Sequence, residues 1–203
     1  EWVYDQEQQI KDPTRIGYTF TGWKVKNGDI PLPYISSGNR SVKNLTTIQS
    51  RTVTLVAQWT PNVYKINFHS NYPNGAADQV ASWNVTYDSA EHKDDTAPGF
   101  TWTHYHMIGY TFNGSNDLQY FWYKGPNDQN YYDNIMSRSN DWWHGSKYKN
   151  PYDIDVYAKW DKNPYVIVYD SNGGSAVASE LSYSGDNHIL AAGPTRSGYT
   201  FVG

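Results

Sequence analysis

The sequence predicts a strand-dominated α+β chain made of small units repeated in tandem. Aromatic residues are abundant, with 19 Tyr, 9 Trp and 6 Phe among 203 residues, and such rings favour strands over helices. Short segments alternate apolar and polar residues, as half-buried strands do. The same segments also recur in one order along the chain, which is the mark of a repeat architecture.

Two short segments recur most clearly. Gly-Tyr-Thr-Phe begins at Gly17, Gly109 and Gly198, and a segment ending in Ala-x-Trp closes at Trp59 and Trp160. The number of residues between these segments varies from copy to copy. Such variation is expected if the shared segments are paired strands and the pieces between them are surface loops.

Each recurring segment alternates as a strand does. Ile66 and Phe68 alternate with polar neighbours, and residues 53–59 and 154–160 alternate in the same way. In every Gly-Tyr-Thr-Phe copy we expect Tyr and Phe to fill the core of one central strand, with Gly allowing turns at its ends. Weaker strands are expected at 1–5, 83–88 and 180–185.

The order of the segments predicts three repeats. Residues 1–61 form a partial repeat without its first strand, residues 62–161 a complete repeat, and residues 162–203 the N-terminal part of a third. The complete repeat carries an aromatic-rich insertion at 115–153. The joints Thr60–Asn62 and Asp161–Pro164 are too short to let the repeats tumble freely, so we expect an elongated, semi-rigid array.

Several segments resemble a known family. "DSNGG", "GPTRSGYTFVG", "DPTRIGYTFTGW" and "DVYAKW" are similar to the Listeria/Bacteroides repeat, or internalin B-repeat, of bacterial surface proteins. The resemblance implies a β-grasp-like fold, an extracellular place in a cell-wall or secreted protein, and an adhesive or spacer role. The second copy departs from the pattern, because Ser115 replaces the Trp after Gly and "YHMI" replaces Pro-Thr-Arg before Gly109.

Composition excludes several classes of function. The net charge is −4 and Lys and Arg form no basic run, so we expect no nucleic-acid partner. No apolar stretch approaches the ~20 residues that span a bilayer, so we expect no membrane insertion within this segment. Cys is absent, which excludes disulfides and thiolate chemistry. No catalytic or nucleotide-binding motif is present, so we expect no enzyme, no catalytic residue and no cofactor.

Two stretches carry potential metal ligands. His104 and His106 are spaced to lie on the same face of a strand, a pair that a metal can use, but no third ligand is identifiable. Residues 127–134 are rich in oxygen ligands but lack the glycine and the terminal Glu of a calcium-binding loop. We therefore expect no metal site.

The insertion holds the strongest candidate for ligand binding. Aromatic rings flanked by Asn, Asp and Lys can form sugar platforms or protein contact sites. The alternative is that these rings only cover a small sheet. The candidate ligand-binding residues are Trp122, Tyr123, Tyr131, Tyr132, Trp142 and Trp143.

The sequence therefore predicts a non-catalytic adhesin stalk, spacer or protein-interaction module whose partner is a host or neighbouring-cell protein or glycan. One alternative is a carbohydrate-binding module that uses the aromatic residues of the insertion. The other is a filament subunit whose partners are other copies of itself. In that case Tyr165, Ile167 and Tyr169 belong to a strand that one molecule donates to the first repeat of the next.

Overall fold

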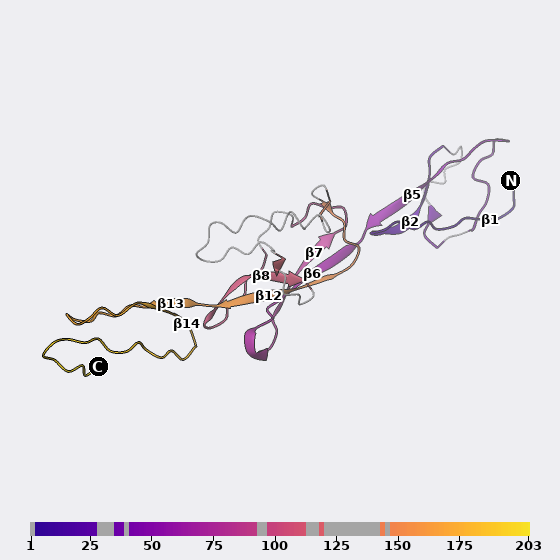
Figure 1. The fold of residues 1–203 in the computed structure, drawn as a ribbon. Coiled ribbons are helices and arrows are strands. Elements are labelled where there is room, and N and C mark those ends of the chain that lie inside the picture. Colours follow the sequence, from indigo (N-terminus) through magenta and orange to yellow (C-terminus); the bar gives the residue numbers. More distant parts are fainter. Residues whose placement is uncertain are drawn as a thin grey trace. The chain divides into compact units, whose positions relative to one another are not determined.

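The computed structural model describes residues 3–27, 35–38, 41–92, 97–112, 118–119, 143–144 and 147–203. Strands dominate these residues, and their only helical segment is the short 3-10 turn η1 (Pro73–Gly75). The prediction of a strand-dominated chain is thereby confirmed (Figure 1).

The chain divides into two compact units, each discontinuous in sequence. The first comprises Glu1–Asn67, Ser82–Asp94 and Met136–Ile154. The second comprises Phe68–Ala81, Asp95–Ile135 and Asp155–Gly203. Neither follows the predicted repeat boundaries, which stay a prediction.

The first strands form a three-stranded sheet in the order β3-β2-β5. It contains β2 (Tyr18–Val25), β3 (Ile35–Ser36) and β5 (Leu55–Pro61), and β2 pairs with β5 antiparallel. A short antiparallel pair joins β1 (Gln8–Gln9) to β4 (Ser41–Val42). The core of this region consists of Ile10, Ile35, Val42 and Leu45, with Trp23, Val53 and Leu55 packed against them. Tyr4 and Asp5 lie in a turn rather than in the strand expected at 1–5.

The largest sheet has five strands in the order β7-β6-β12-β8-β9. Its strands are β6 (Val63–His69), β7 (Val80–Thr86), β8 (Tyr105–Phe112), β9 (Leu118–Gln119) and β12 (Ile154–Lys162). The alternation seen in the sequence is confirmed here, because Ile66 and Phe68 are fully buried while Lys65 is exposed. A separate short pair joins β10 (Trp143–His144) to β11 (Lys147–Tyr148).

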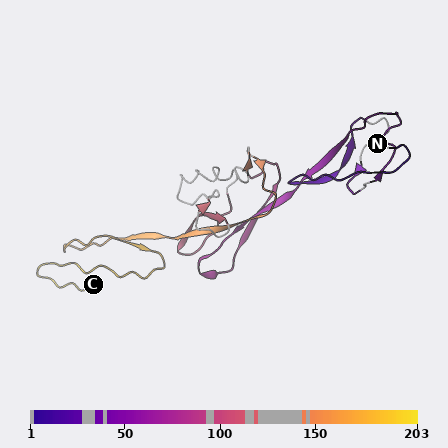
Figure 2. The ribbon, with the colours of Figure 1, turned by 45° about the vertical axis from the view of Figure 1, so that its right-hand side comes forward.

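The last strands form a two-stranded pair. β13 (Pro164–Ile167) pairs antiparallel with β14 (Glu180–Tyr183), and Figure 2 shows the two side by side, ahead of an extended C-terminal segment. The rings of Tyr199 and Phe201 are 69% and 57% exposed. The expectation that they fill a core is therefore wrong for this copy of Gly-Tyr-Thr-Phe, because residues 198–203 form no strand.

The second Gly-Tyr-Thr-Phe copy does not occupy the place of the first. In the first sheet Phe20 lies opposite Trp59, and in the second Met107 lies opposite Trp160. Counted from these Trp residues, Gly109 takes the place of Gly22. Gly22 lies five positions further along the chain than Gly17, where the first copy begins. Both glycines adjoin the register shift of their strand pair, with φ of 147° and 152°.

The true counterpart of Gly17 is His104. The backbone φ is 76° at Gly17, 70° at His104 and 78° at Gly198. In all three copies the next Tyr donates its backbone N–H to the carbonyl two residues before this position, which belongs to Arg15, Trp102 or Arg196. Hence "GFTWT", not "YHMI", replaces the Pro-Thr-Arg lead-in. Aligning the copies by their four shared residues misplaced the second copy relative to the first. Strand register is set by the partner strand and by the irregularity in β8, not by the identity of four residues.

Candidate functional site

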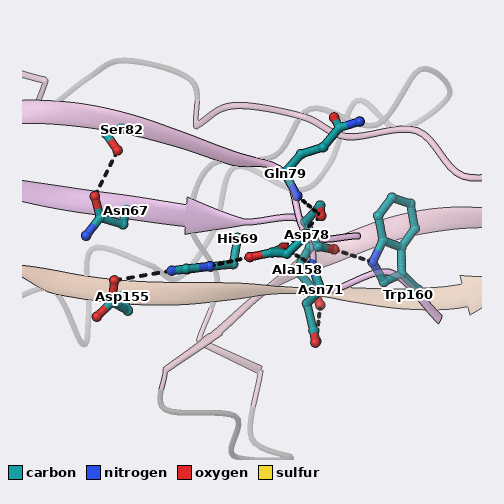
Figure 3. A network of polar contacts seen from close by, with 10 residues as sticks. Asn67, His69, Asn71, Asp78, Gln79, Ser82, Asp155, Ala158 and Trp160 are labelled. Carbon is teal, nitrogen blue, oxygen red and sulfur yellow. Dashed lines mark hydrogen bonds and ion pairs between the residues drawn. The ribbon is translucent and has the colours of Figure 1, made fainter. Parts of the chain in front are cut away.

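The end of β6 holds a histidine between two carboxylates. His69 is the last residue of this strand, and its Nδ1 lies 2.6 Å from Asp78 Oδ2 while its Nε2 lies 3.2 Å from Asp155 Oδ1 (Figure 3). The imidazole stacks on Tyr157, with 4.7 Å between ring centroids. Asp78 is fixed in turn, because its Oδ1 accepts hydrogen bonds from the Ser70 hydroxyl and the Asn71 N–H.

These contacts shift both titrations. Burial lowers the pKa of His69, but the hydrogen bonds and charges of Asp78 and Asp155 outweigh it, so this pKa is raised. For Asp78, burial raises the pKa, but hydrogen bonds from His69, Asn71 and Ser70 outweigh it, so this pKa is lowered. The site therefore favours a charged imidazolium between ionised carboxylates.

The sign of the shift gives a pH dependence. Because the pKa of His69 is higher in the folded chain, its stabilisation is fully present below the ordinary value of 6.5 and is lost as the pH rises through the folded value. We expect the free energy of unfolding to fall by up to about 1 kcal/mol on alkaline titration, since Asp78 and Asp155 are partly exposed. Urea unfolding at several pH values measures it, and His69→Gln should abolish this component. An unchanged profile in His69→Gln would contradict the assignment.

An aromatic cluster adjoins the histidine. The Tyr72 ring stacks on Trp102 at 4.5 Å between centroids and lies 5.6 Å from Trp160. Phe100 packs against Tyr72 from the edge. Two hydrogen bonds anchor the cluster to the sheet: the Trp160 indole N–H donates to Ser70 O at 2.8 Å, and the Asn71 side chain donates to Ala158 O at 3.0 Å. Alternation in the sequence predicted that Trp160 lies on one face of a strand. It gave no signal for the positions of Tyr72, Phe100 and Trp102, which lie outside the strands.

The first joint is held by an asparagine. The Asn62 N–H donates to Gly17 O at 2.9 Å, and Asn62 O accepts from the Tyr87 N–H at 2.8 Å. Its side-chain oxygen also accepts from the Thr19 hydroxyl at 2.6 Å. The backbone and the side chain of Asn62 thus tie together segments that precede and follow the joint.

The second joint repeats this arrangement. The Asn163 N–H donates to His104 O at 2.9 Å, and Asn163 O accepts from the Ser184 N–H at 2.8 Å. The Asn163 side-chain oxygen lies 3.0 Å from His106 Nδ1. Since His104 and His106 are the counterparts of Gly17 and Thr19, the same bonds occur at the same places in both joints.

Further contacts reinforce the first joint. Asp88 accepts from the Tyr18 hydroxyl at 2.6 Å and from the Lys149 ammonium at 2.5 Å. The hydrogen bonds from Lys149 and Tyr18 lower the pKa of Asp88 to about 2. Gly17 lies so close to Tyr87 that a Cβ placed on it would come within 2.4 Å of the ring. The joint therefore depends on a residue without a side chain at position 17.

The two histidines considered above as potential metal ligands do not both lie in a strand. The expectation that His104 and His106 share a strand face is wrong, because His104 lies in the turn before β8 with a φ of 70°. Its Nδ1 lies 2.5 Å from the Ser184 hydroxyl. No group of three or more potential metal ligands comes together within the described part of the chain. Residues 127–134 lie outside it.

Most of the predicted ligand-binding residues cannot be placed. Trp122, Tyr123, Tyr131, Tyr132 and Trp142 lie outside the described residues, and of Trp143 only the backbone in β10 is described. Ligand binding by this insertion stays a prediction.

The residues predicted for strand donation lie together. Tyr165 and Ile167 belong to β13, and Tyr169 follows it closely. The Tyr169 hydroxyl donates to Glu180 at 2.5 Å and accepts from the Ala191 N–H at 3.0 Å. Their role in strand donation stays a prediction.

The fold and joints can now be compared with known proteins. Residues 4–58 and 165–203 match the family model of the Listeria-Bacteroides repeat domain. These two segments are similar to Listeria-Bacteroides repeats. The predicted family is thereby confirmed. The matched segments of the Listeria-Bacteroides repeats leave out residues 59–164, which include the stretch where His104 takes the place of Gly17.

Two curated relatives of these repeats come from Evansella cellulosilytica. One, named "Putative Gly-rich membrane protein", is 28% identical over 99% of this chain and 19% of its own length. The other, named "Putative membrane protein", is 25% identical over 96% of this chain and 24% of its own length. The chain thus spans about a fifth to a quarter of the relatives it matches. No solved structure matches significantly. Within the described residues, no helix has the length and apolar character needed to cross a membrane.

Proposed function

We propose that this chain is a non-catalytic repeat region of a bacterial cell-surface or secreted protein, where it acts as an adhesin stalk, spacer or protein-interaction module. The Listeria-Bacteroides repeats and the relatives named as membrane proteins suggest a surface repeat protein. Its partner would be a protein or glycan of a host or a neighbouring cell. Fold alone is a weak guide to function, so the support for a spacer role comes from the hydrogen bonds at the two joints.

The observation that supports a spacer is the repeated asparagine joint. A flexible linker leaves its backbone groups to water, whereas Asn62 and Asn163 each place their N–H and their carbonyl in hydrogen bonds to different segments. Such bonds limit rotation at the joint. A stiff joint holds consecutive repeats at a fixed angle, as a stalk requires.

Spin labels across the first joint test this role. The chain has no cysteine, so Lys24→Cys with Asn84→Cys gives one labelled pair at two exposed positions on either side of Asn62. We expect electron–electron resonance to give a single narrow distance distribution. Asn62→Pro should broaden this distribution, because proline lacks the N–H that donates a hydrogen bond to Gly17 O.

Val63→Thr serves as the matched control. Val63 is the next residue and is 61% exposed, so this change keeps every backbone donor of the joint and should leave the distribution narrow. A broad distribution in the unaltered joint would refute the spacer role.

A further inference from the structure

Each joint brings together two residues with a left-handed backbone, one before the joint asparagine in sequence and one after it. At the first joint they are Gly17, with φ of 76°, and Asp88, with φ of 67°. At the second they are His104, with φ of 70°, and Gly185, with φ of 82°. Asp and His adopt this conformation more readily than most residues with a side chain, and Gly adopts it freely. Each joint thus has one glycine, but on opposite sides of its asparagine.

Backbone hydrogen bonds show that the residues after the two joints correspond. The N–H of Tyr87 donates to the carbonyl of the first joint asparagine, and the N–H of Ser184 donates to that of the second. Two residues later, Ser89 and Asp186 each donate their N–H to the carbonyl three residues before them. Tyr87 and Ser184 are therefore counterparts, and so are the residues that follow them.

At the first joint the ring belongs to the residue after the asparagine. A Cβ on Gly17 would come within 2.4 Å of three atoms of the Tyr87 ring, so this ring occupies the space of a side chain at position 17. The Tyr87 ring also meets the Tyr18 ring edge-on, with 5.4 Å between centroids. A tyrosine after this joint therefore requires a glycine before it.

At the second joint the ring belongs to the residue before the asparagine. His104 Nδ1 lies 2.5 Å from the Ser184 hydroxyl. A Cβ on Gly185 would lie 3.3 Å from two atoms of the His104 ring. The small side chain of Ser184 and the absence of one at Gly185 leave room for the imidazole. A histidine before this joint therefore requires small residues after it.

We infer that the pairs Gly17–Tyr87 and His104–Ser184 select which repeat can adjoin which. The repeat at 62–161 presents Tyr87 to the repeat before it and His104 to the repeat after it. Two copies of this repeat in tandem would place both rings in one space. A contact that fits the correct neighbour and a clash with the wrong one both contribute to specificity. The inference concerns the order of the repeats and does not depend on the adhesive or spacer role.

Charged side chains add a second difference between the joints. Lys162 forms an ion pair with Asp186 across the second joint. Their counterparts at the first joint are Pro61 and Ser89, which carry no charge. The ion pair is 38% and 41% exposed, so it contributes little to stability. It nevertheless favours a repeat with Asp186 over one with Ser89 at this place.

Exchanging the two residues of the second joint tests the inference. Ser184→Tyr should lower the urea midpoint of unfolding, because a ring placed as that of Tyr87 would occupy the Cβ position of His104. His104→Gly should also lower it, because the hydrogen bond to Ser184 is lost. The double variant recreates the pair found at the first joint. Its midpoint should therefore lie well above the value obtained by adding the two single shifts.

Spin labels report on the joint itself. Thr101→Cys with Val166→Cys places labels at two exposed positions, one before Asn163 and one after it. The distance distribution should change in Ser184→Tyr and return to that of the unaltered joint when His104→Gly is added. The urea comparison does not require a narrow distribution, so it tests the inference separately from the spacer role.

Leu181→Tyr is the matched control. It adds the same ring to the same strand, β14, at a position that is 58% exposed. Its urea midpoint should stay close to that of the unaltered chain and should gain nothing from His104→Gly. Additive effects of Ser184→Tyr and His104→Gly would overturn the inference, and so would an equal gain for Leu181→Tyr.

The reverse exchange at the first joint decides the matter if a variant of the second joint fails to fold. Gly17→His should destabilise the chain because of the Tyr87 ring, and Tyr87→Ser should restore part of the loss by providing the space and the hydroxyl that His104 has at Ser184. Gly38→His has a comparable φ of 84° and no described residue within 4 Å of its Cβ position, so it should gain nothing from Tyr87→Ser. No recovery of Gly17→His would overturn the inference.

Discussion

Replacing Phe68 by Ala should lower the free energy of unfolding by about 3–5 kcal/mol, the cost of removing a large aromatic side chain from a packed core. Phe68 is fully buried on β6 of the five-stranded sheet and meets the Tyr110 ring edge-on, with 5.2 Å between centroids. Urea unfolding followed by circular dichroism measures the change.

Val80→Ala is the control for this substitution. Val80 lies on a neighbouring strand of the same sheet but is 53% exposed, so its truncation should change the free energy of unfolding by less than about 0.5 kcal/mol. Similar losses for Phe68→Ala and Val80→Ala would show that the β6 core does not carry the stability of this sheet.

Gly17→Ala should be the most damaging glycine substitution at the first joint. The backbone there has a φ of 76°, a left-handed conformation that costs a residue with a side chain roughly 1–2 kcal/mol. The added Cβ would also lie 2.4 Å from the Tyr87 ring, so the ring or the backbone must move. We expect a total loss above about 2 kcal/mol by thermal or urea unfolding.

Gly38→Ala separates the two causes. Gly38 has a φ of 84°, and no described residue lies within 4 Å of the position of its Cβ, so its substitution should carry the conformational cost alone. The excess loss in Gly17→Ala measures the contact with Tyr87. That excess should disappear when Gly17→Ala is made in a Tyr87→Ala background. An equal loss for Gly17→Ala and Gly38→Ala would mean that Tyr87 does not pack against the joint.

The sequence predicted the strands better than their register. Alternation identified β6 and β12 because each buries one face, as Ile66 and Phe68 show. It misplaced the second Gly-Tyr-Thr-Phe copy, because the irregularity at Gly109 and the pairing of Met107 with Trp160 depend on the partner strand. A position that requires positive φ is filled by Gly17 in one repeat and by His104 in another, so no single letter marks it.

The candidate sites were less predictable than the strands. His69, Asp78 and Asp155 come together from three separate segments, and no local sequence pattern predicts their contact. The asparagine joints were visible only as short linkers in the sequence. Their hydrogen bonds depend on where the preceding and following strands end, which local periodicity does not give.

The offset of five residues between the two Gly-Tyr-Thr-Phe copies has a consequence for anyone who builds chimeras from these modules. The irregularity between Phe20 and Gly22 absorbs one of the five residues: Tyr18 lies opposite Pro61, and Trp23, whose place Tyr110 takes, lies opposite Ala57, four residues away. Grafting the later tetrapeptide onto the earlier one would therefore keep its rings on the same face but displace them by four residues along the partner strand. Crossover points chosen by distance from Trp59 and Trp160 would avoid this displacement.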